Sequence, residues 1–537
     1  MEKLQTETIY SDKIINRLGL ACLLLFIVSY LSHLGVLPLD IRTDEARRAL
    51  VSLEMMLSGD YITPTLNGEL YLNKPPLYNW IMVAAIKGGG NYNPFWYRLP
   101  VIISIGIFAL LIYRYVSRYS TKMIAVVTVF AFITNGRIII YDSLQGLIEL
   151  TFGFCMYWLM MLVFHYGEQK KYWQLFLFTY LLTAAGYLMK GLPSLAFEAF
   201  TLLTYFTYSK RFKVLFSIQH LAGILLLAII LGGYYFVYFN HNNLSPQVLF
   251  TKLLTESTDR TAVKYGFWYT VFHLLYYPFI MMYHYAPWML LALVLIKKNV
   301  FKAINADPFI KFNWWVFLAN FIVYWTSPEV YARYLFPLLA PLFTVLVYLF
   351  YTHTKPEDWQ RKWPEKVFGW LLAVCTLALL VVPFTGAVSK VFFEWIKALS
   401  CAAAIGFCTW FYYKQPIYRL LTLALAMFVV RVAFNWFVID QRGKYLRQME
   451  DLAVKIYTIT KDHPLYLEKG ANHGNFDGMS FHLSSRRAQI LRFAAADTSS
   501  FFITDSIHLA GKKYEQFLDF DNPYADHLWL VKYKQTK

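Results

Sequence analysis

Long apolar stretches constrain this chain more than any other feature of its sequence. Runs that approach or reach the length of a membrane-spanning helix recur along most of the chain, among them 18–36, 172–189, 221–239, 334–351, 367–382 and 417–438. A helix needs about 20 apolar residues to cross the hydrocarbon core of a bilayer. Because lipid offers the backbone no hydrogen bonds, such segments cross it as helices. The sequence therefore predicts an all-α, polytopic membrane bundle.

Composition and charge agree with a membrane protein and argue against other classes. With 58% hydrophobic and 15% charged residues, the chain is too apolar for an ordinary water-soluble globule. Much of the net charge of +17 falls in short Lys- and Arg-rich clusters beside the apolar runs, at 114–122, 170–171, 210–213, 297–311, 355–366 and 414–419. Cytoplasmic loops of membrane proteins carry such clusters. We therefore expect contact with membrane lipids and no nucleic-acid partner.

The positions of these clusters predict a topology. If they and the amino terminus lie on the cytoplasmic side, the apolar runs divide into about 13 spans that alternate in direction. The opposite, outer face then receives residues 39–93, 135–144, 189–192, 240–268, 327–333, 386–397 and everything after 440. We expect a membrane domain at 1–440, with its first outer loop at 39–93.

The end of the chain differs from the rest in hydropathy. After residue 440, strand-like stretches at 464–467, 489–492 and 501–504 alternate with helix-like segments at 444–460 and 506–520. This pattern predicts a small α/β domain at 441–537, on the outer face. The domain contains no Gly-rich phosphate loop and no metal-ligand spacing, so we expect a lid or packing module.

The first outer loop carries the most informative polar residues. Asp44, Glu45 and Arg47 open a segment whose apolar residues recur at helical spacing, namely Ala46, Ala49, Leu50, Leu53 and Leu57. The spacing predicts a helix that lies along the membrane surface. Its charged residues either cap the helix and meet lipid head groups or take part in chemistry.

Further along this loop, Lys74 precedes two prolines, Pro75 and Pro76. Both prolines restrict the backbone, so the lysine is held in place, and a held cation suits an anionic ligand. The alternative is a lysine that extends its ammonium group to the interface beside a turn. Tyr71 is either a hydrogen-bond donor to such a ligand or an interfacial tyrosine.

Together these motifs resemble a known family. The combination of Asp44-Glu45-x-Arg47, Gly59-Asp60 with Pro64 and Asn67-Gly68, and Tyr71-x-x-Lys74-Pro75-Pro76 resembles the lipid-phosphosugar-dependent glycosyltransferases of the GT-C fold. The aminoarabinose lipid A transferases and their protein O-mannosyltransferase relatives are the most similar members. Further matches follow in order along the chain: Arg98-Leu99-Pro100, Arg137 with Asp142, Lys190-Gly191-x-Pro193, Pro287-Trp288, and Tyr334-Leu335-x-Pro337 with Pro341.

The resemblance implies a multi-pass enzyme of the bacterial inner membrane that uses no nucleotide and has its carboxy-terminal domain in the periplasm. Such enzymes take a sugar from a polyprenyl (undecaprenyl) phosphate and pass it, with inversion, to an acceptor on the outer side. The acceptor is lipid A, another glycolipid or a protein. This chemistry needs a carboxylate for the attacking group and cations for the departing phosphate. The candidate catalytic residues are Asp44, Glu45 and Asp142, and the candidate phosphate-binding residues are Lys74, Arg47, Arg260, Tyr71, Arg137 and Arg333.

The role of Asp44 depends on the acceptor. A hydroxyl must lose its proton, so a base is useful, whereas a lipid phosphate is already ionised and needs only positioning. Since adjacent helical residues point in different directions, we expect either Asp44 or Glu45 to be structural.

The sequence also departs from the aminoarabinose transferases. In those relatives a Glu commonly precedes the Lys-Pro-Pro motif and a Glu-His pair lies in a later outer loop, where this chain has Asn73 and Glu256-Ser257. Amides and hydroxyls are poor zinc ligands, so we expect no metal, and transfer of aminoarabinose itself is in doubt. A lipid flippase or transporter and a binding scaffold are the competing classes.

Overall fold

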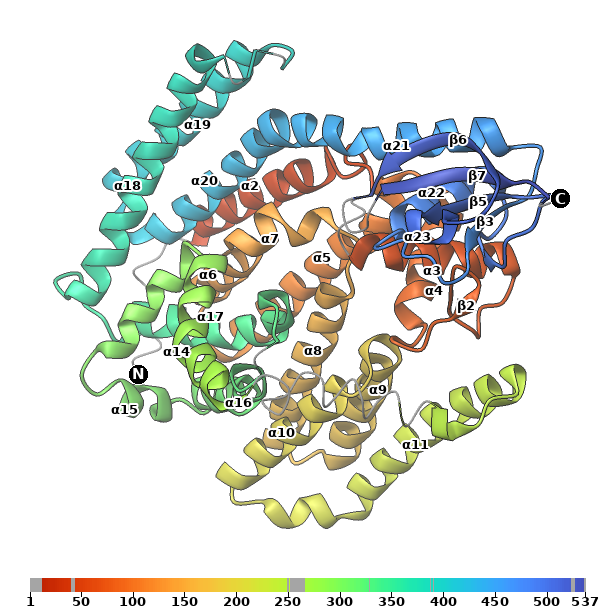
Figure 1. Cartoon of the computed structure of the whole chain (residues 1–537). Coiled ribbons are helices and arrows are strands. Elements are labelled where there is room, and N and C mark those ends of the chain that lie inside the picture. The colour runs from red at the N-terminus through yellow and green to blue at the C-terminus, as the bar shows by residue number, and fades with distance from the viewer. Residues whose placement is uncertain are drawn as a thin grey trace.

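The computed structural model describes residues 12–39, 44–248, 251, 266–327, 329–386, 388–389, 391–522 and 527–535 (Figure 1). These residues form a large helical body with a small sheet-containing domain at one end, which confirms the predicted fold class. The helical body contains α2 (Asp12–Leu31), α5 (Pro94–Tyr119), α6 (Lys122–Ile133), α7 (Gly136–Ile140), η1 (Asp142–Leu144), α8 (Ile148–Glu168), α9 (Tyr172–Lys190), α10 (Pro193–Tyr208), η2 (Phe212–Phe216), α11 (Ile218–Asn242), α14 (Phe267–His284), η3 (Trp288–Ile296), α15 (Val300–Ala306), α16 (Pro308–Trp325), η4 (Ala332–Leu335), α17 (Phe336–Thr352), α18 (Trp359–Val381), η5 (Val382–Thr385), α19 (Glu394–Lys414), η6 (Pro416–Tyr418) and α20 (Arg419–Phe434).

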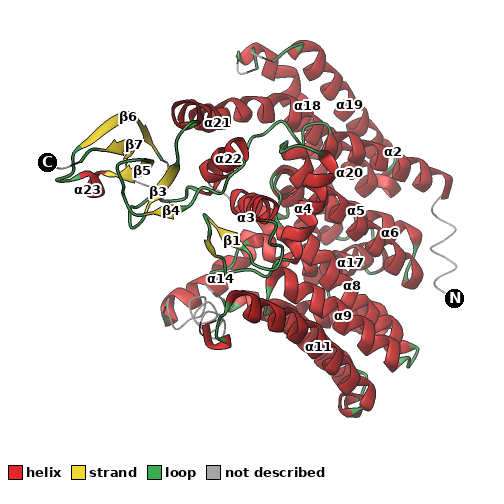
Figure 2. Cartoon of the chain, turned by 90° about the vertical axis from the view of Figure 1, so that its right-hand side faces the viewer, coloured by secondary structure: helices red, strands yellow, loops and turns green. Residues whose placement is uncertain are grey.

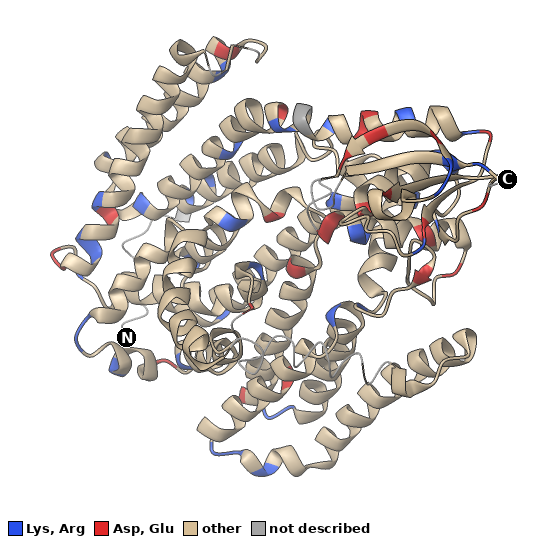
Figure 3. Cartoon of the chain, viewed as in Figure 1, with Lys and Arg blue, Asp and Glu red and all other residues tan. Residues whose placement is uncertain are grey.

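Helices long and apolar enough to cross a membrane are numerous. The described residues contain eight, or up to nine if the bent pair Lys122–Ile133 and Gly136–Leu144 forms one span. Charged residues are sparse along these helices and gather near their ends and in the sheet domain (Figure 3). The protein is therefore multi-pass, as predicted. The count of about 13 stays a prediction, because elements such as α10, with 16 residues, are shorter than a full span.

The packing of the helices matches two different environments. Nearly every residue of α17 is buried, and α17 packs against α6, α8 and α16 at the centre of the body. In contrast, α11 and the α18–α19 pair expose large apolar side chains such as Phe236, Trp370 and Phe407. An apolar surface of this kind is stable only where lipid is the solvent, so these helices form the rim of the bundle.

A thin outer layer lies between the helical body and the sheet domain (Figure 2). It consists of α3 (Asp44–Ser58), a hairpin of β1 (Thr65–Leu66) and β2 (Glu69–Leu70), and α4 (Leu77–Gly89). Asn67 and Gly68 form the two-residue turn of the hairpin, with φ of 51° and 76°. Asn-Gly is the preferred pair for such a turn, because both positions need positive φ. The predicted surface helix is thus α3, and its residues Ala46, Ala49, Leu50 and Leu53 are buried.

The carboxy-terminal domain is built on a five-stranded sheet of order β4-β3-β5-β7-β6. Its elements are α21 (Asp440–Thr460), β3 (Leu465–Glu468), α22 (Asp477–Arg487), β4 (Phe493–Ala494), β5 (Phe501–Asp505), α23 (Ser506–Leu509), β6 (Tyr514–Asp521) and β7 (His527–Tyr533). β3 pairs in parallel with β4 and β5, while β7 runs antiparallel to β5 and β6. Through the π-helix η7 (Asn435–Ile439), α20 continues into α21, so the expected boundary at 440 falls within one helical run.

Two sequence expectations for this domain are wrong. The stretch 489–492, expected as a strand, has no regular structure, and the two-residue strand β4 follows it. The predicted helix at 506–520 is only the short α23, followed by the edge strand β6. The apolar residues Phe517 and Phe520 are three positions apart, a spacing that suits a helix. Pairing with β7 along most of its length overrides that local pattern, because strand formation depends on the tertiary partner.

Candidate active site

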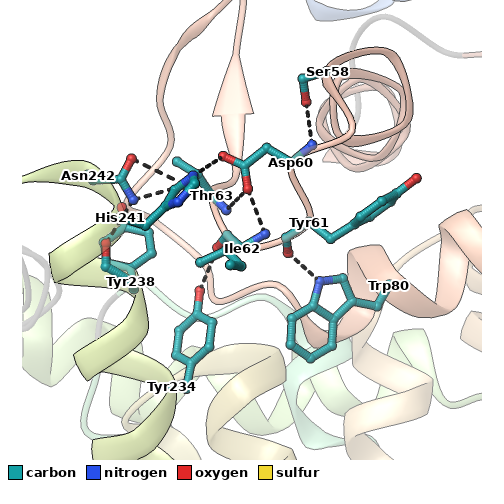
Figure 4. A network of polar contacts seen from close by, with 10 residues as sticks. All are labelled: Ser58, Asp60, Tyr61, Ile62, Thr63, Trp80, Tyr234, Tyr238, His241 and Asn242. Atoms are coloured by element: carbon teal, nitrogen blue, oxygen red, sulfur yellow. Dashed lines mark hydrogen bonds and ion pairs between the residues drawn. The ribbon is translucent and has the colours of Figure 1, made fainter.

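The first outer loop is held against the end of α11 by a polar network (Figure 4). The Asp60 carboxylate accepts hydrogen bonds from the backbone N–H groups of Ile62 (2.9 Å) and Thr63 (3.1 Å), and its other oxygen lies 3.1 Å from His241 Nε2. Asn242 Nδ2 donates to Thr63 Oγ1 at 2.9 Å. Burial acts to raise the pKa of Asp60, but the hydrogen bonds outweigh it and hold the pKa below its ordinary value. The loop is therefore anchored as a carboxylate-centred turn.

A buried carboxylate of α3 fixes the hairpin. Glu54 accepts hydrogen bonds from Thr65 Oγ1 (2.7 Å) and from the backbone N–H groups of Asn67 (2.7 Å) and Gly68 (3.1 Å). Burial raises the pKa of Glu54, although these hydrogen bonds oppose the shift. The hairpin, and with it the Tyr71–Pro76 stretch that follows, thus has a defined position beside α3.

Beneath this layer lies a cavity of about 720 Å³. Its polar walls come from the start of α3, from residues 64–75, and from the facing ends of α8 and α9. Its apolar and aromatic walls come mainly from α10, α11 and α16. The lining residues used below are Asp44, Arg47, Arg48, Tyr71, Asn73, Lys74, Glu149, Lys190, Phe197, Tyr235, Tyr238, Tyr324 and Tyr334.

A ladder of alternating charges runs along one side of the cavity. Arg333 Nη2 donates to Asp44 Oδ2 at 2.6 Å, and Arg333 Nε lies 3.6 Å from Glu149 Oε1. The same Glu149 oxygen lies 3.3 Å from Lys190 Nζ, which sits 4.0 Å from the centre of the Tyr334 ring. Asp44, Glu149 and Lys190 therefore line this wall, and Arg333 bridges its two carboxylates. Of these groups Asp44 is the most exposed, with 51% of its side chain accessible against 13% for Arg333.

The opposite side of the cavity is suited to an apolar chain. Phe197, Tyr235, Tyr238 and Tyr324 line it, and they belong to α10, α11 and α16. Since α11 is exposed along most of its length, this wall adjoins the surface that faces lipid. The shape and lining of the cavity thus suit a molecule with one anionic and one apolar end. Such a molecule can enter from the bilayer, because the apolar wall adjoins the lipid-facing surface.

The structure brings together most of the predicted residues of the first loop. Asp44, Arg47, Tyr71 and Lys74 all line the cavity. The Tyr71 hydroxyl hydrogen-bonds Arg48, whose guanidinium lies 4.9 Å from the centre of the Tyr71 ring. Tyr71 is therefore not a free interfacial tyrosine.

Glu45, next to Asp44, lies elsewhere. Its oxygens accept two hydrogen bonds from Arg98, from Nε at 2.7 Å and Nη2 at 2.8 Å, and one from the Gly146 backbone N–H at 2.6 Å. A side chain at Gly146 would not fit, because its Cβ would lie 2.7 Å from the Tyr97 carbonyl oxygen. Both Glu45 and Arg98 are almost fully buried, and neither lines the cavity. This geometry gives Glu45 a structural contact in place of a reactive one.

Asp142 and Arg137 form a pair of their own. Asp142 Oδ2 lies 2.5 Å from Arg137 Nε, and the carboxylate is buried in the η1 turn. Neither residue is part of the cavity lining. Their predicted roles in catalysis and phosphate binding stay predictions.

Two predicted features fall partly outside the structure. Arg260, Glu256 and Ser257 lie outside the described residues. Within the described ranges, no three His, Cys, Asp or Glu side chains come close enough to hold a metal ion. Asn73 does line the cavity. The metal-free site stays a prediction.

Glu149 and Lys190 are the site residues that the sequence analysis did not select. Lys190 appears there only within the Lys190-Gly191 motif. Lys190 falls in the predicted outer segment 189–192, and Glu149 lies shortly after the outer segment 135–144. A search for ionisable residues at the outer ends of spans would have found both.

Comparison with known proteins identifies the fold. The structure of ArnT from Cupriavidus metallidurans bound to undecaprenyl phosphate matches with a TM-score of 0.70 at 16% identity, over 95% of this chain and 97% of that one. The chain thus has the fold of ArnT, that of a helical membrane protein.

Sequence comparison gives a resemblance to particular families. The sequence model of the dolichyl-phosphate-mannose-protein mannosyltransferases matches residues 73–236. The undecaprenyl phosphate-alpha-4-amino-4-deoxy-L-arabinose arabinosyl transferase of Edwardsiella ictaluri is 29% identical over 192 residues, 33% of each chain. The transferase of the same name from Pseudomonas savastanoi is 38% identical over 95 residues, 18% of this chain and 17% of its own length. The chain therefore resembles the aminoarabinose transferases and O-mannosyltransferases, as predicted, and the match spans about a third or less of the relatives' length.

Proposed function

We propose that this protein is an integral membrane glycosyltransferase that moves a sugar from a polyprenyl phosphate to an acceptor on the outer face of the membrane. The observation that carries the proposal is the cavity itself, where Asp44, Glu149 and Lys190 face an apolar wall and Arg333 bridges the two carboxylates. A polyprenyl phosphate has one anionic end and one apolar end. The likeness to a structure that holds undecaprenyl phosphate supports this choice of donor.

The reaction moves one bond and one electron pair. An acceptor oxygen attacks the anomeric carbon of the sugar, the bond from that carbon to the phosphate oxygen breaks, and its electron pair stays on the phosphate. Lys74, Arg47 and Lys190 supply positive charge where this negative charge develops. Arg260, outside the described residues, is a further candidate. Direct displacement from one face inverts the anomeric carbon.

Asp44 is the proposed group for the acceptor. It is the accessible carboxylate of the charge ladder, and Arg333 fixes its orientation. If the acceptor is a hydroxyl, its proton passes to Asp44; if it is a lipid phosphate, Asp44 orients the sugar or a cation. Lipid A or another glycolipid is the proposed acceptor, and a protein hydroxyl is the alternative. The proposed orientation places the amino terminus in the cytoplasm and the carboxy-terminal domain in the periplasm, across the inner membrane.

The test is transfer of labelled sugar from a panel of polyprenyl-phosphate sugars to extracted glycolipids and proteins. We expect transfer by the wild type, and rates about 100-fold lower for Asp44→Asn and for Lys74→Ala. Lys87→Ala is the matched control, because Lys87 lies at the end of the same outer layer, bonds Tyr61 and does not line the cavity. If the wild type transfers no sugar but moves the carrier lipid across vesicle membranes, the protein is a flippase and the proposal is wrong.

A further inference from the structure

The carboxy-terminal domain reaches the cavity through one ion pair. Asp477 opens α22, which packs against α3, and its Oδ2 accepts a hydrogen bond from Arg47 Nε at 2.8 Å. The two residues are 430 positions apart in the chain. Asp477 has 9% of its side chain exposed and Arg47 has 33%. A partly buried, charge-assisted hydrogen bond of this length is stronger than a surface ion pair.

Two further contacts fix α22 in place. Phe481, one turn beyond Asp477, is 2% exposed and packs into the same apolar core as the membrane helices. Its ring lies 5.9 Å from that of Tyr97 and 6.3 Å from that of Tyr92, both at an edge-on angle. Asp477 is therefore held by packing that is independent of its bond to Arg47.

The domain also contacts the hairpin. The Arg492 side chain lies against Gly68, so close that a Cβ at Gly68 would be 2.9 Å from Arg492 Cγ. Arg492 also acts electrostatically on Glu54, the carboxylate that holds the hairpin. The domain thus contacts both α3 and the hairpin that precedes Tyr71 and Lys74. Arg47 lines the cavity. Among the described residues of this domain, Asp477 is the one that forms a hydrogen bond between charged groups with a residue of the cavity lining.

The contact with Asp477 occupies only part of the Arg47 guanidinium. A guanidinium has five N–H donors, and Asp477 takes the one at Nε. The two terminal nitrogens can still bind an anion in the cavity, and their plane is set by the fixed Nε bond. A preoriented cation loses less side-chain entropy on binding a ligand than a mobile one.

We propose that Asp477 is a positioning residue of the active site, which holds Arg47 so that its terminal nitrogens bind the phosphate of the polyprenyl donor. The proposal rests on the proposed function. It makes the carboxy-terminal domain a part of the donor site, beyond a lid or packing module.

The test measures affinity for undecaprenyl phosphate in the purified full-length protein, with Asp477 changed in two ways. Asp477→Asn keeps the shape and removes the charge, and we expect it to weaken binding roughly tenfold. Asp477→Glu keeps the charge and changes the shape, and we expect affinity within about threefold of the wild type. A purely structural role predicts the reverse order. That reverse order, or wild-type affinity in Asp477→Asn, would overturn the proposal.

The Arg47→Ala background separates positioning from a folding defect. There Asp477→Asn should change affinity by less than about twofold, because the group it positions is gone. An equal loss in both backgrounds, or no loss from Arg47→Ala alone, would overturn the proposal. Glu450→Gln is the matched control, since it breaks the other ion pair of α22, between Glu450 and Arg486 (3.1 Å), without touching α3. Failure of the proposed function is distinguishable, because it appears in the wild type as absent binding and absent transfer.

Discussion

Arg333 Nη2 lies 2.6 Å from Asp44 Oδ2, although the two residues are 289 positions apart in the chain. The pair joins the start of α3, in the outer layer, to η4, at the entrance to the central helix α17. Because Arg333 also contacts Glu149, one guanidinium orients both carboxylates of the cavity wall. The position of the proposed catalytic carboxylate thus depends on a residue from the other end of the membrane domain.

We therefore expect Arg333→Gln to lower the transfer rate about 100-fold, since Asp44 loses its orientation and Glu149 loses one of its two cations. Initial rates of sugar transfer at saturating donor measure the effect. Arg361→Gln is the control, because Arg361 bonds Glu365 at 2.9 Å, and neither residue lines the cavity. If the rates fall equally in both variants, the loss in Arg333→Gln comes from impaired folding and not from the position of Asp44.

Loss of charge at the neighbours Asp44 and Glu45 should affect different properties, the transfer rate for Asp44 and the stability of the fold for Glu45. Glu45→Gln leaves Arg98 buried without its carboxylate, which should destabilise the protein by about 3 kcal/mol. Asp44→Asn should leave the unfolding midpoint nearly unchanged, because half of that side chain is exposed, while transfer is lost. Thermal unfolding and transfer assays on the same preparations separate the two. If the unfolding temperature falls equally in both variants, the structural role of Glu45 and the catalytic role of Asp44 are not separate, and this prediction is wrong.

The Asp60 turn should control the mobility of the first outer loop. In Asp60→Ala the backbone N–H groups of Ile62 and Thr63 lose their acceptor, and we expect their hydrogen exchange to accelerate about tenfold or more. Asp497→Ala is a matched control, since Asp497 caps Ser499 and Ser500 in the same way within the carboxy-terminal domain. Unchanged exchange at residues 62–63 would mean that α11 alone holds the loop.

Stability should fall in mildly acidic solution because of His482. This histidine of α22 is buried, and burial lowers its pKa below the ordinary value of 6.5. The charge of Glu450 opposes this shift and that of Arg486 adds to it, and the pKa stays lowered. The unfolded chain then binds the proton more readily, so the free energy of unfolding is highest above pH 6.5 and decreases as the pH falls below it. The slope is at most about 1.4 kcal/mol per pH unit.

Unfolding midpoints at about pH 5.0 and 7.5 measure this dependence. His482→Gln should reduce the difference between the two midpoints, whereas His463→Gln, at an exposed histidine of the same domain, should not. A difference that is the same in wild type and His482→Gln would rule out His482 as its source.

Local sequence patterns predicted those parts of the fold that depend on neighbouring residues. The apolar runs predicted the spans, and the helical spacing after Asp44 predicted α3. The edge strand β6 was missed, because its residues have a helical spacing and only the pairing with β7 makes them a strand. The first-loop residues that line the cavity were also selected, since their motif is continuous in sequence.

The sequence by itself determined a polytopic helical membrane protein with a small α/β domain, and it selected Asp44, Arg47, Tyr71 and Lys74. Apolar length and charge position suffice for these conclusions, because the bilayer acts on each segment separately. Only the tertiary structure decided that Glu45 pairs with Arg98, that Glu149 and Lys190 complete the charge ladder, and that Asp477 holds Arg47. These ion pairs join residues far apart in the chain, and no periodicity in one segment determines which distant side chain will form an ion pair with it.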